Sequence, residues 1–325
     1  MSKFKVFVTR HLPIVLDQLH AIASVEIWPE RQPPPYEVLL EKVKTIDGVL
    51  CLLTDRIDRP LIETGTSLKV ISQMAVGYDN IDIPTATARQ LPVGYTPDVL
   101  TDATADFAWT LLMAAARRVV EADQFVRAGK WQTWEPDLLL GPNITGATLG
   151  IVGLGRIGQA VAKRAKGFEM QILYTNKHPC HPELEQSLEA EFVTFDRLLQ
   201  ESDFVTIHTS LAEDTYHLFS QAQFEQMQQS AILINTARGA IVDPDALYQA
   251  LSTGQIAAAA LDVTEPEPIP INSPLLALNN LIIAPHIASA SRQTREKMAR
   301  MAIANLVAGL KGDRLPHCVN PEVYQ

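Results

Sequence analysis

The sequence predicts an α/β protein of two doubly wound, parallel-sheet domains, with one domain inserted into the other. Three observations lead to this fold class. Short apolar runs alternate with helix-length periodic segments along most of the chain, as they do in successive βαβ units. A length of 325 residues corresponds to about two hydrophobic cores at roughly 150 residues per domain. A long helical segment precedes the second series of alternating elements, and another one closes it.

The first series of elements lies in the first hundred residues. Three prolines at 33–35 predict a loop within it, because proline has a fixed φ and no N–H to donate. The pattern changes near Pro97, and the apolar periodicity then predicts one long helix over about 103–127. The expected strands of this series are residues 5–8, 25–28, 48–53 and 69–72.

The second series runs from about residue 148 to 285 and is followed by a predicted helix over 291–311. Since helical segments flank this series on both sides, we predict that residues 100–288 form an inserted domain. Residues 1–99 and 289–325 then form one discontinuous domain. Two sequential domains divided near residue 147 are the alternative that the pattern leaves open.

Charge and cysteine content narrow the class of protein. The chain has 27 basic and 37 acidic residues, a net charge of −10, and an acidic surface repels nucleic acids and anionic membranes. No apolar run approaches the ~18 residues that a membrane span requires. Three cysteines cannot form a disulfide framework and fit a reducing compartment. We therefore expect a cytoplasmic enzyme that binds neither nucleic acid nor membrane.

A glycine-rich motif lies between a predicted buried strand and a predicted helix. From Gly153 to Gly158 the chain reads G-L-G-R-I-G. In this context Gly153 permits a tight turn, Gly155 lets the backbone approach a pyrophosphate, and Gly158 allows close packing of helix on strand. Free N–H groups at the helix start then face the anion, and Arg156 lies where it can attract one. The motif predicts a dinucleotide site in a Rossmann-like domain.

The residues after the next strand favour NADPH over NADH. That strand, 171–174, leads into Thr175, where NAD-binding domains usually place Asp or Glu about 20 residues past the glycine motif to hold the ribose 2′-hydroxyl. Here Thr175, Asn176 and Lys177 follow, and the first acid is Glu183. Lys177 would attract a 2′-phosphate, and the other two side chains could donate to it. A polar loop that tolerates either cofactor is the alternative.

A cluster in the same loop, 178–181, reads H-P-C-H and invites comparison with a zinc site. It lacks a separated second pair of ligands, which structural zinc sites require. We therefore expect no metal.

Two strand ends predict catalytic residues, because open parallel sheets place their ligands at the carboxyl ends of strands. Arg238 follows the apolar run 232–234, and its guanidinium could bind both oxygens of a carboxylate. His286 follows the run 281–284 and is the only one of eight histidines placed directly after a buried run at a predicted domain boundary. Histidine titrates near neutral pH, as a proton donor to a carbonyl must.

A third segment, after the run 258–261, is rich in acids. Prolines at 266, 268 and 270 have fixed φ and predict a stiff extended segment around Glu267. Glu265 and Glu267 are both candidate partners of a catalytic histidine, and the spacing does not choose between them. Asp262 either accepts a hydrogen bond from a cofactor carboxamide or caps local backbone.

Together these residues resemble the D-isomer-specific 2-hydroxyacid dehydrogenase family, over nearly the whole chain and least before about residue 45. The resemblance is greatest to NADPH-dependent glyoxylate/hydroxypyruvate reductases, in the stretches 93–102, 153–159, 257–268 and 285–289. The family's Arg–Glu–His set falls on Arg238, Glu267 and His286, which favours Glu267 over Glu265. The chain departs from the family at Asp106, where glutamate is common.

The resemblance implies further contacts. Backbone N–H groups of Val76 and Gly77 would bind the substrate carboxylate, with Ser289 nearby. Trp134 would reach the partner's active site in a homodimer joined through the cofactor domain. The implied cofactor contacts are the glycine motif with Ile157, residues 175–177, Asp262 and His286, and also Thr104, Thr209, Ser210, Thr215, Thr236, Ala237 and Ala288.

The activity that the resemblance implies is reduction of small 2-oxo acids, glyoxylate or hydroxypyruvate, to D-2-hydroxy acids, with NADPH preferred and NADH possible. Residues 100–288 would be the NAD(P)-binding domain, and 1–99 with 289–325 the substrate domain. The alternatives are an NAD-dependent lactate-type dehydrogenase, a phosphite or formate dehydrogenase, and a corepressor-like binding module. The absence of lysine near Ala75 opposes phosphite. Which oxo acid is preferred depends on the reach of Leu52, Leu53 and Trp134.

Overall fold

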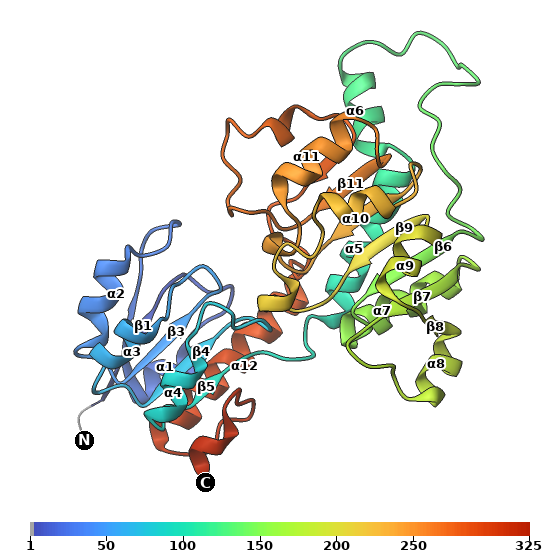
Figure 1. Cartoon of the computed structure of the whole chain (residues 1–325). Coiled ribbons are helices and arrows are strands. Elements are labelled where there is room, and N and C mark those ends of the chain that lie inside the picture. Colours follow the sequence, from blue (N-terminus) through green and yellow to red (C-terminus); the bar gives the residue numbers. More distant parts are fainter. Residues whose placement is uncertain (1–2) are drawn as a thin grey trace. The chain divides into compact units, whose positions relative to one another are not determined.

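The computed structural model describes residues 3–325, and the chain divides into two compact units (Figure 1). Unit 1 comprises Met1–Leu100 and Ala290–Gln325, and unit 2 comprises Thr101–Ser289. Unit 2 is thus inserted into unit 1 along the chain, and each unit contains one parallel sheet, so the predicted fold class is confirmed. The boundaries of the units lie one residue beyond the expected ones, 99/100 and 288/289.

Unit 1 is a doubly wound sheet with the spatial strand order β2-β1-β3-β4-β5, and all its pairs are parallel. β5 has only two residues, too short to stand out as an apolar run, and β3 ends at Cys51 rather than at residue 53. The strands are β1 (Phe4–Val8), β2 (Ala23–Ile27), β3 (Gly48–Cys51), β4 (Val70–Gln73) and β5 (Val93–Gly94). The helices are α1 (Asp17–Ile22), α2 (Tyr36–Val43), α3 (Arg59–Thr64), α4 (Ile83–Ala88), α12 (Arg292–Lys311) and the 3₁₀ turn η4 (Pro321–Tyr324).

The helix α12 returns the end of the chain to unit 1. Ser291 caps its N-terminus by accepting a hydrogen bond from the Thr294 N–H. Its inner face is joined to the sheet, because the Ser72 hydroxyl donates to the Ala302 carbonyl at 2.8 Å. Asn305 donates its side-chain amide to the Tyr95 carbonyl at 2.9 Å. Neither this helix nor any other in residues 3–325 is long and apolar enough to cross a membrane.

Unit 2 has the spatial strand order β12-β11-β10-β9-β6-β7-β8, again with parallel pairs. Counted from β6, the order is that of dinucleotide-binding domains with one added strand, and it reverses between β6 and β9. The strands are β6 (Thr148–Val152), β7 (Gln171–Thr175), β8 (Ala190–Phe192), β9 (Phe204–Ile207), β10 (Ile232–Asn235), β11 (Ala258–Leu261) and β12 (Leu281–Ile283). The helices are α5 (Thr101–Ala116), α6 (Val119–Arg127), α7 (Arg156–Lys166), α8 (Pro182–Leu188), α9 (Phe195–Glu201), α10 (Gln221–Gln226) and α11 (Pro244–Ser252), with 3₁₀ turns η1 (Glu213–Thr215), η2 (Gly239–Ile241) and η3 (Pro274–Ala277).

Helices cover both faces of the unit 2 sheet. One core packs Trp109 of α5 with Ile151 of β6, and the other packs Leu247 of α11 with Val205 of β9. Strands buried on both faces read as continuous apolar runs, and this is why the sequence located them well.

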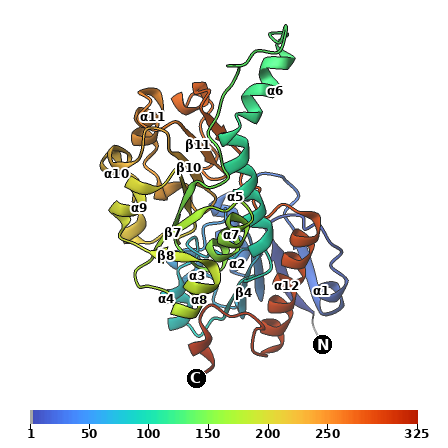
Figure 2. The same cartoon turned by 90° about the vertical axis from the view of Figure 1, so that its right-hand side faces the viewer.

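The single helix expected over 103–127 is wrong, because the chain forms two helices there. Arg118 adopts a left-handed conformation with φ +49°, which ends the α5 hydrogen-bond ladder. Its guanidinium then bonds to Glu121 in the first turn of α6, with N–O distances of 2.8 and 2.9 Å. No residue of α6 is buried, and this helix and the loop after it extend away from the sheet of unit 2 (Figure 2).

Candidate active site

The glycine motif follows β6 at the point where the strand order of unit 2 reverses. Gly153 has φ +98°, and a Cβ there would lie 2.7 Å from the backbone nitrogen of Thr209. A Cβ at Gly158 would clash with the Gly153 carbonyl oxygen, so α7 packs on the turn as expected. Gly155, by contrast, has open space within 4 Å of its Cβ position, directly at the N-terminus of α7, where Arg156 is exposed.

The loop after β7 is fastened to the glycine motif. The Asn176 side chain accepts from the Leu154 N–H at 2.7 Å, so its oxygen is used within the protein. Its amide nitrogen lies 3.3 Å from the Cys180 sulfur. Lys177 is ion-paired with Asp214 at 2.6 Å, although both side chains are more than half exposed. The partner of Lys177 is therefore an acid from another loop of unit 2.

One buried hydroxyl at the carboxyl edge of the unit 2 sheet is unsatisfied. Thr236 follows β10, is 8% exposed, and its Oγ1 has no hydrogen-bond partner among the described residues. Buried hydroxyl groups are nearly always paired, so an unpaired one at this edge fits a ligand contact. The open space at Gly155 fits the approach of a pyrophosphate to the same edge. The residues present therefore fit a bound dinucleotide.

The other residues expected to contact cofactor lie in unit 2. Thr209 adjoins Gly153, and Thr215 uses its hydroxyl to close the turn after β9 by donating to the Ser210 carbonyl at 2.7 Å. Thr104 is buried in α5. Ile157 follows Arg156 in the first turn of α7, Ser210 is exposed, Ala237 is half-buried and Ala288 is buried.

Arg238 directly follows the turn at the end of β10. Asn235 shapes this turn, because its side chain accepts from the Ala237 N–H at 3.0 Å and donates to the Arg238 carbonyl at 2.8 Å. A Cβ at Gly239 would clash with the Thr264 carbonyl oxygen, so the absence of a side chain there lets the two loops touch. The Arg238 loop and the acidic segment after β11 are thereby packed together.

His286 and Glu267 form the central pair of the site. The Nδ1 of His286 lies 2.5 Å from the Glu267 Oε1, and both side chains are partly exposed. The opposite ring nitrogen, Nε2, is thus the one left to face a substrate. His286 has φ +55°, and its N–H donates to the Asp262 carbonyl at 2.8 Å.

Asp262 caps local backbone, which is one of its two expected roles. Its two carboxylate oxygens accept from the Ile287 and Ala288 N–H groups, each at 2.7 Å. The side chain is 1% exposed, and burial raises the pKa of this carboxyl while the two backbone hydrogen bonds oppose the rise. Asp262 therefore fixes the loop that carries His286.

Of the two candidate glutamates, Glu267 is the one that contacts His286. Glu265 does not meet His286; its Oε2 lies 2.6 Å from the Nε2 of His217, a histidine that no sequence pattern singled out. The segment around them is bent over 265–268 rather than extended, and the Thr264 hydroxyl folds it by donating to the Pro266 carbonyl at 2.8 Å. Fixed φ at proline does not by itself make a segment straight.

One further histidine lies at the same edge of the sheet. His208 follows β9, and its Nε2 lies 2.9 Å from the Thr206 hydroxyl oxygen. Burial lowers the pKa of His208 to about 3, so its ring is neutral at ordinary pH. A neutral imidazole adds no charge beside the glycine motif.

Val76 and Gly77 belong to unit 1, where they lie half-buried in the bend after β4. The bend is held by the Met74 N–H, which donates to the Cys51 carbonyl at 3.0 Å, and by the Ala75 carbonyl, which accepts from the Thr96 N–H at 2.9 Å.

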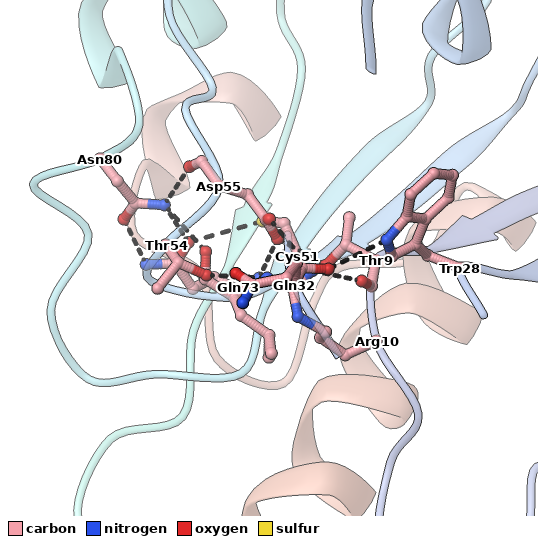
Figure 3. A network of polar contacts seen from close by, with 10 residues as sticks. Thr9, Arg10, Trp28, Gln32, Cys51, Thr54, Asp55, Gln73 and Asn80 are labelled. Atoms are coloured by element: carbon pink, nitrogen blue, oxygen red, sulfur yellow. Dashed lines mark hydrogen bonds and ion pairs between the residues drawn. The ribbon is translucent and has the colours of Figure 1, made fainter. Parts of the chain in front are cut away.

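Two side-chain amides fasten this bend to the sheet of unit 1 (Figure 3). Gln73, fully buried at the end of β4, donates to the Gly77 carbonyl at 2.6 Å and to the Asn80 side-chain oxygen at 2.7 Å. Asn80 donates back to Gln73 at 2.9 Å and to the Asp55 carbonyl at 2.8 Å. The reciprocal pair of Gln73 and Asn80 thus holds the bend after β4, and the hydrogen bond from Asn80 to the Asp55 carbonyl joins this bend to the loop after β3. Sequence reasoning missed this pair, although Gln73 is a polar residue at the end of a buried run.

Asp55 joins the same network to the first strand. Its carboxylate accepts from the Thr9 hydroxyl at 2.5 Å and from the Leu52 N–H at 2.7 Å, and Arg10 lies 3.7 Å away. Burial raises the pKa of Asp55, and these hydrogen bonds oppose the rise. The turn that begins with Leu52 and Leu53 is held in this way.

Trp134 lies in the long loop between α6 and β6 and is 78% exposed. Other large apolar side chains of this helix and loop are exposed with it, namely Val119, Val126, Trp131 and Leu140. Ser289 ends unit 2. Asp106, the departure from the family pattern, still reaches Arg164 of α7, whose Nε donates to its carboxylate at 2.8 Å.

The chain is similar to known proteins over nearly its whole length. Residues 109–288 match the family model of the D-isomer specific 2-hydroxyacid dehydrogenase, NAD binding domain. The chain is 50% identical to a glyoxylate reductase of Korarchaeum cryptofilum over 325 residues, covering 99% of this chain and 98% of that protein. It is 49% identical to a glyoxylate reductase of Thermococcus litoralis, with coverage of 99% and 98%.

A solved structure is similar over the same extent. The NADPH-dependent glyoxylate/hydroxypyruvate reductase of Sinorhizobium meliloti, crystallised with NADP and malonate, superposes with a TM-score of 0.87 at 30% identity and covers 98% of each chain. With a family model that matches more than half of its length and relatives that align over nearly all of it, the chain belongs to the D-isomer-specific 2-hydroxyacid dehydrogenase family of oxidoreductases.

Proposed function

We propose that this protein reduces small 2-oxo acids, glyoxylate and hydroxypyruvate, to 2-hydroxy acids of D configuration where the product is chiral, with NADPH as reductant. The observation that carries the proposal is the 2.5 Å contact between His286 Nδ1 and Glu267, in a loop packed against the one that presents Arg238. A histidine so held, beside an arginine, is suited to protonate a carbonyl next to a carboxylate.

Each residue of this set has a separate role in the proposed reaction. The bound nicotinamide supplies the hydride. His286 donates the Nε2 proton to the carbonyl oxygen, and Glu267 keeps the ring oriented through Nδ1. Arg238 binds the substrate carboxylate and stabilises the negative charge that develops on the oxygen. In unit 1, the proposed donors to a substrate carboxylate are the N–H groups of Val76 and Gly77.

The preference for NADPH is supported by the loop after β7. No acid occupies its first positions, and Lys177 offers a positive charge where a ribose 2′-phosphate would bind. The Sinorhizobium relative is named as NADPH-dependent. The proposed cofactor contacts are those placed at the carboxyl edge of the unit 2 sheet, above all Gly155 and Thr236.

The proposed partner is a second copy of this chain. The exposed apolar side chains of α6 and the following loop offer a surface for it, and Trp134 would enter the partner's active site. Sedimentation velocity measures the association, and a fully active monomer would contradict it.

Steady-state kinetics test the proposed activity. Glyoxylate, hydroxypyruvate, pyruvate and formate are compared with NADPH and with NADH. The decisive variant is His286→Asn, because asparagine tolerates the left-handed φ at this position but cannot act as the acid. We expect kcat to fall by about 10²–10⁴-fold. His20→Gln, at an exposed position in α1, is the matched control. Absence of 2-oxo acid reduction in the unmodified protein, or near-normal turnover by His286→Asn, would contradict the proposal.

A further inference from the structure

We infer that His217 is a positioning residue whose ring ties the loop carrying Glu267 to the segment that follows Arg238, and so keeps Glu267 against His286. The inference rests on the proposed function for its kinetic consequence. It concerns a second histidine–glutamate pair, His217 with Glu265, which lies beside the proposed catalytic pair and does not overlap with it.

The ring of His217 is held on three sides. Its Nε2 lies 2.6 Å from the Glu265 Oε2, and its Nδ1 lies 3.8 Å from the Asp243 Oδ2. The ring of Tyr216 stacks on it at 4.0 Å between centroids with a 14° tilt, and the Glu265 carboxylate raises the pKa of Tyr216. About 29% of each of the His217 and Glu265 side chains is exposed, so the contact is partly shielded from water.

Glu265 transmits the position of this ring to Glu267. The two glutamates are separated by one residue in a segment that bends over 265–268. The Thr264 hydroxyl closes the bend on Pro266 at 2.8 Å, and the Thr264 N–H points to the Glu267 Oε2 at 3.5 Å. A displacement of Glu265 in so tight a bend therefore displaces Glu267 as well.

The other side of His217 is joined to the segment after Arg238 through the backbone. The His217 N–H donates to the Ala240 carbonyl at 2.8 Å, and the Phe219 N–H donates to Ile241 at 3.0 Å. Asp243 caps α11 by accepting from two backbone N–H groups, so it is itself fixed. His217 is thus anchored to one loop by main chain and holds the other by its ring.

The expected effect follows from how sharply catalysis depends on alignment. Hydrogen bonds weaken steeply when their angle opens, and a 1 Å misplacement of a reacting group can cost about 10²-fold in rate. Loosening one anchor of the Glu267 loop is a smaller change than removing His286, the proposed proton donor. We expect kcat to fall by about 10-fold, with an unchanged KM for NADPH because the glycine motif is not involved.

Three variants test this role. His217→Asn tolerates the left-handed φ of +48° but is too short to reach Glu265. Glu265→Ala removes the partner, and Glu265→Gln keeps an acceptor for the ring and should retain most of the activity. The double variant His217→Asn with Glu265→Ala should be no worse than either single change, since both remove one interaction. His20→Gln is again the control.

Proton NMR of the protein without substrate gives a readout that does not depend on turnover. A proton on His286 Nδ1 that is hydrogen-bonded to Glu267 should resonate downfield of ordinary ring protons and vanish in His286→Asn, which assigns it. We expect this resonance to broaden or disappear in His217→Asn while thermal unfolding stays cooperative.

The outcomes separate this inference from the proposed function. If the unmodified protein reduces no 2-oxo acid, the proposed function fails, and the resonance alone then decides whether His217 positions Glu267. If kcat and the resonance are both unchanged in His217→Asn, the inference is wrong. A fall in kcat with an unchanged resonance and a lower Tm also overturns it, because His217 would then act only on stability.

Discussion

Lys177 and Asp214 show how one exposed ion pair bears on cofactor choice. The Lys177 ammonium donates a hydrogen bond to Asp214 that holds the pKa of this carboxyl below its usual range. A ribose 2′-phosphate must compete with Asp214 for the same ammonium group. The pair therefore weakens the preference for NADPH that Lys177 alone would give.

Removing the competing charge should strengthen that preference. We expect Asp214→Asn to lower the KM for NADPH by about two- to five-fold, the size expected for an exposed charge contact, and to leave the KM for NADH unchanged. Lys177→Gln should raise the KM for NADPH selectively. Parallel titrations with the two cofactors measure both effects, and equal changes for NADPH and NADH would contradict this role of the pair.

The site residues that the sequence predicted are those whose positions are marked by their immediate neighbours in the chain. Arg238 and His286 each follow a short apolar run that forms a strand, so their place at the sheet edge can be predicted from the neighbouring residues. His217 follows no such run, and its partner Glu265 lies 48 positions further along the chain. Pairings of this kind depend on which loops the topology brings together, which local spacing does not reveal. The resemblance to a family, and not the spacing, separated Glu267 from Glu265.

At the scale of elements, the turn from β6 into α7 separates two uses of glycine. A Cβ at Gly158 would clash with the Gly153 carbonyl oxygen, whereas a Cβ at Gly155 would meet nothing within 4 Å. Gly158 is therefore needed for packing the helix on the strand. Gly155 leaves space at the N-terminus of α7 into which the pyrophosphate of a cofactor would fit.

Alanine substitutions should separate stability from cofactor binding. Gly158→Ala is expected to lower the free energy of unfolding by about 1–3 kcal/mol, because the backbone must shift. Gly155→Ala should fold normally, since its φ of −74° suits alanine, yet bind NADPH at least about ten-fold more weakly because the methyl group occupies the space of the pyrophosphate. Urea denaturation and fluorescence titration of the cofactor measure the two effects. Unchanged affinity in Gly155→Ala would place the dinucleotide elsewhere.

The elements themselves were predicted where they are long and buried. All the expected strands of unit 1 exist, but β5, with two residues, carries no pattern. The break between α5 and α6 was missed for a related reason. Apolar residues continue at helical spacing through Val119 and Val126, but these side chains are exposed, so the pattern there reflects a surface and not a core. Arg118 in a left-handed conformation is not signalled by its residue type.

At the scale of the whole molecule, the insertion of one domain into another was readable because helices flank the second series of strands. The network that joins β1, β3 and β4 in unit 1 could not be predicted from the sequence. Thr9 follows β1, Asp55 lies in the loop after β3, and Gln73 ends β4 with Asn80 in the loop after it, so only the sheet order β1-β3-β4 brings them together. Parallel sheets concentrate polar side chains at one edge, so such networks follow from topology even where no local motif exists.

The folded state also sets a pH dependence of stability through His208. Its pKa is about 3 in the folded protein against an ordinary value near 6.5, because burial disfavours the charged ring. The unfolded chain therefore binds this proton more readily than the folded one. The contribution of neutral His208 to stability is complete above about pH 6.5 and is lost as the pH falls below it, at up to about 1.4 kcal/mol per pH unit.

His208→Gln keeps a polar contact for Thr206 and removes the titration. Urea denaturation between pH 7.5 and 4.5 should then show a smaller loss of unfolding free energy for this variant than for the unmodified protein. His181→Gln, at a side chain that is 74% exposed, should leave the slope unchanged. Equal slopes for His208→Gln and the unmodified protein would mean that His208 is protonated in the folded state as easily as in the unfolded chain.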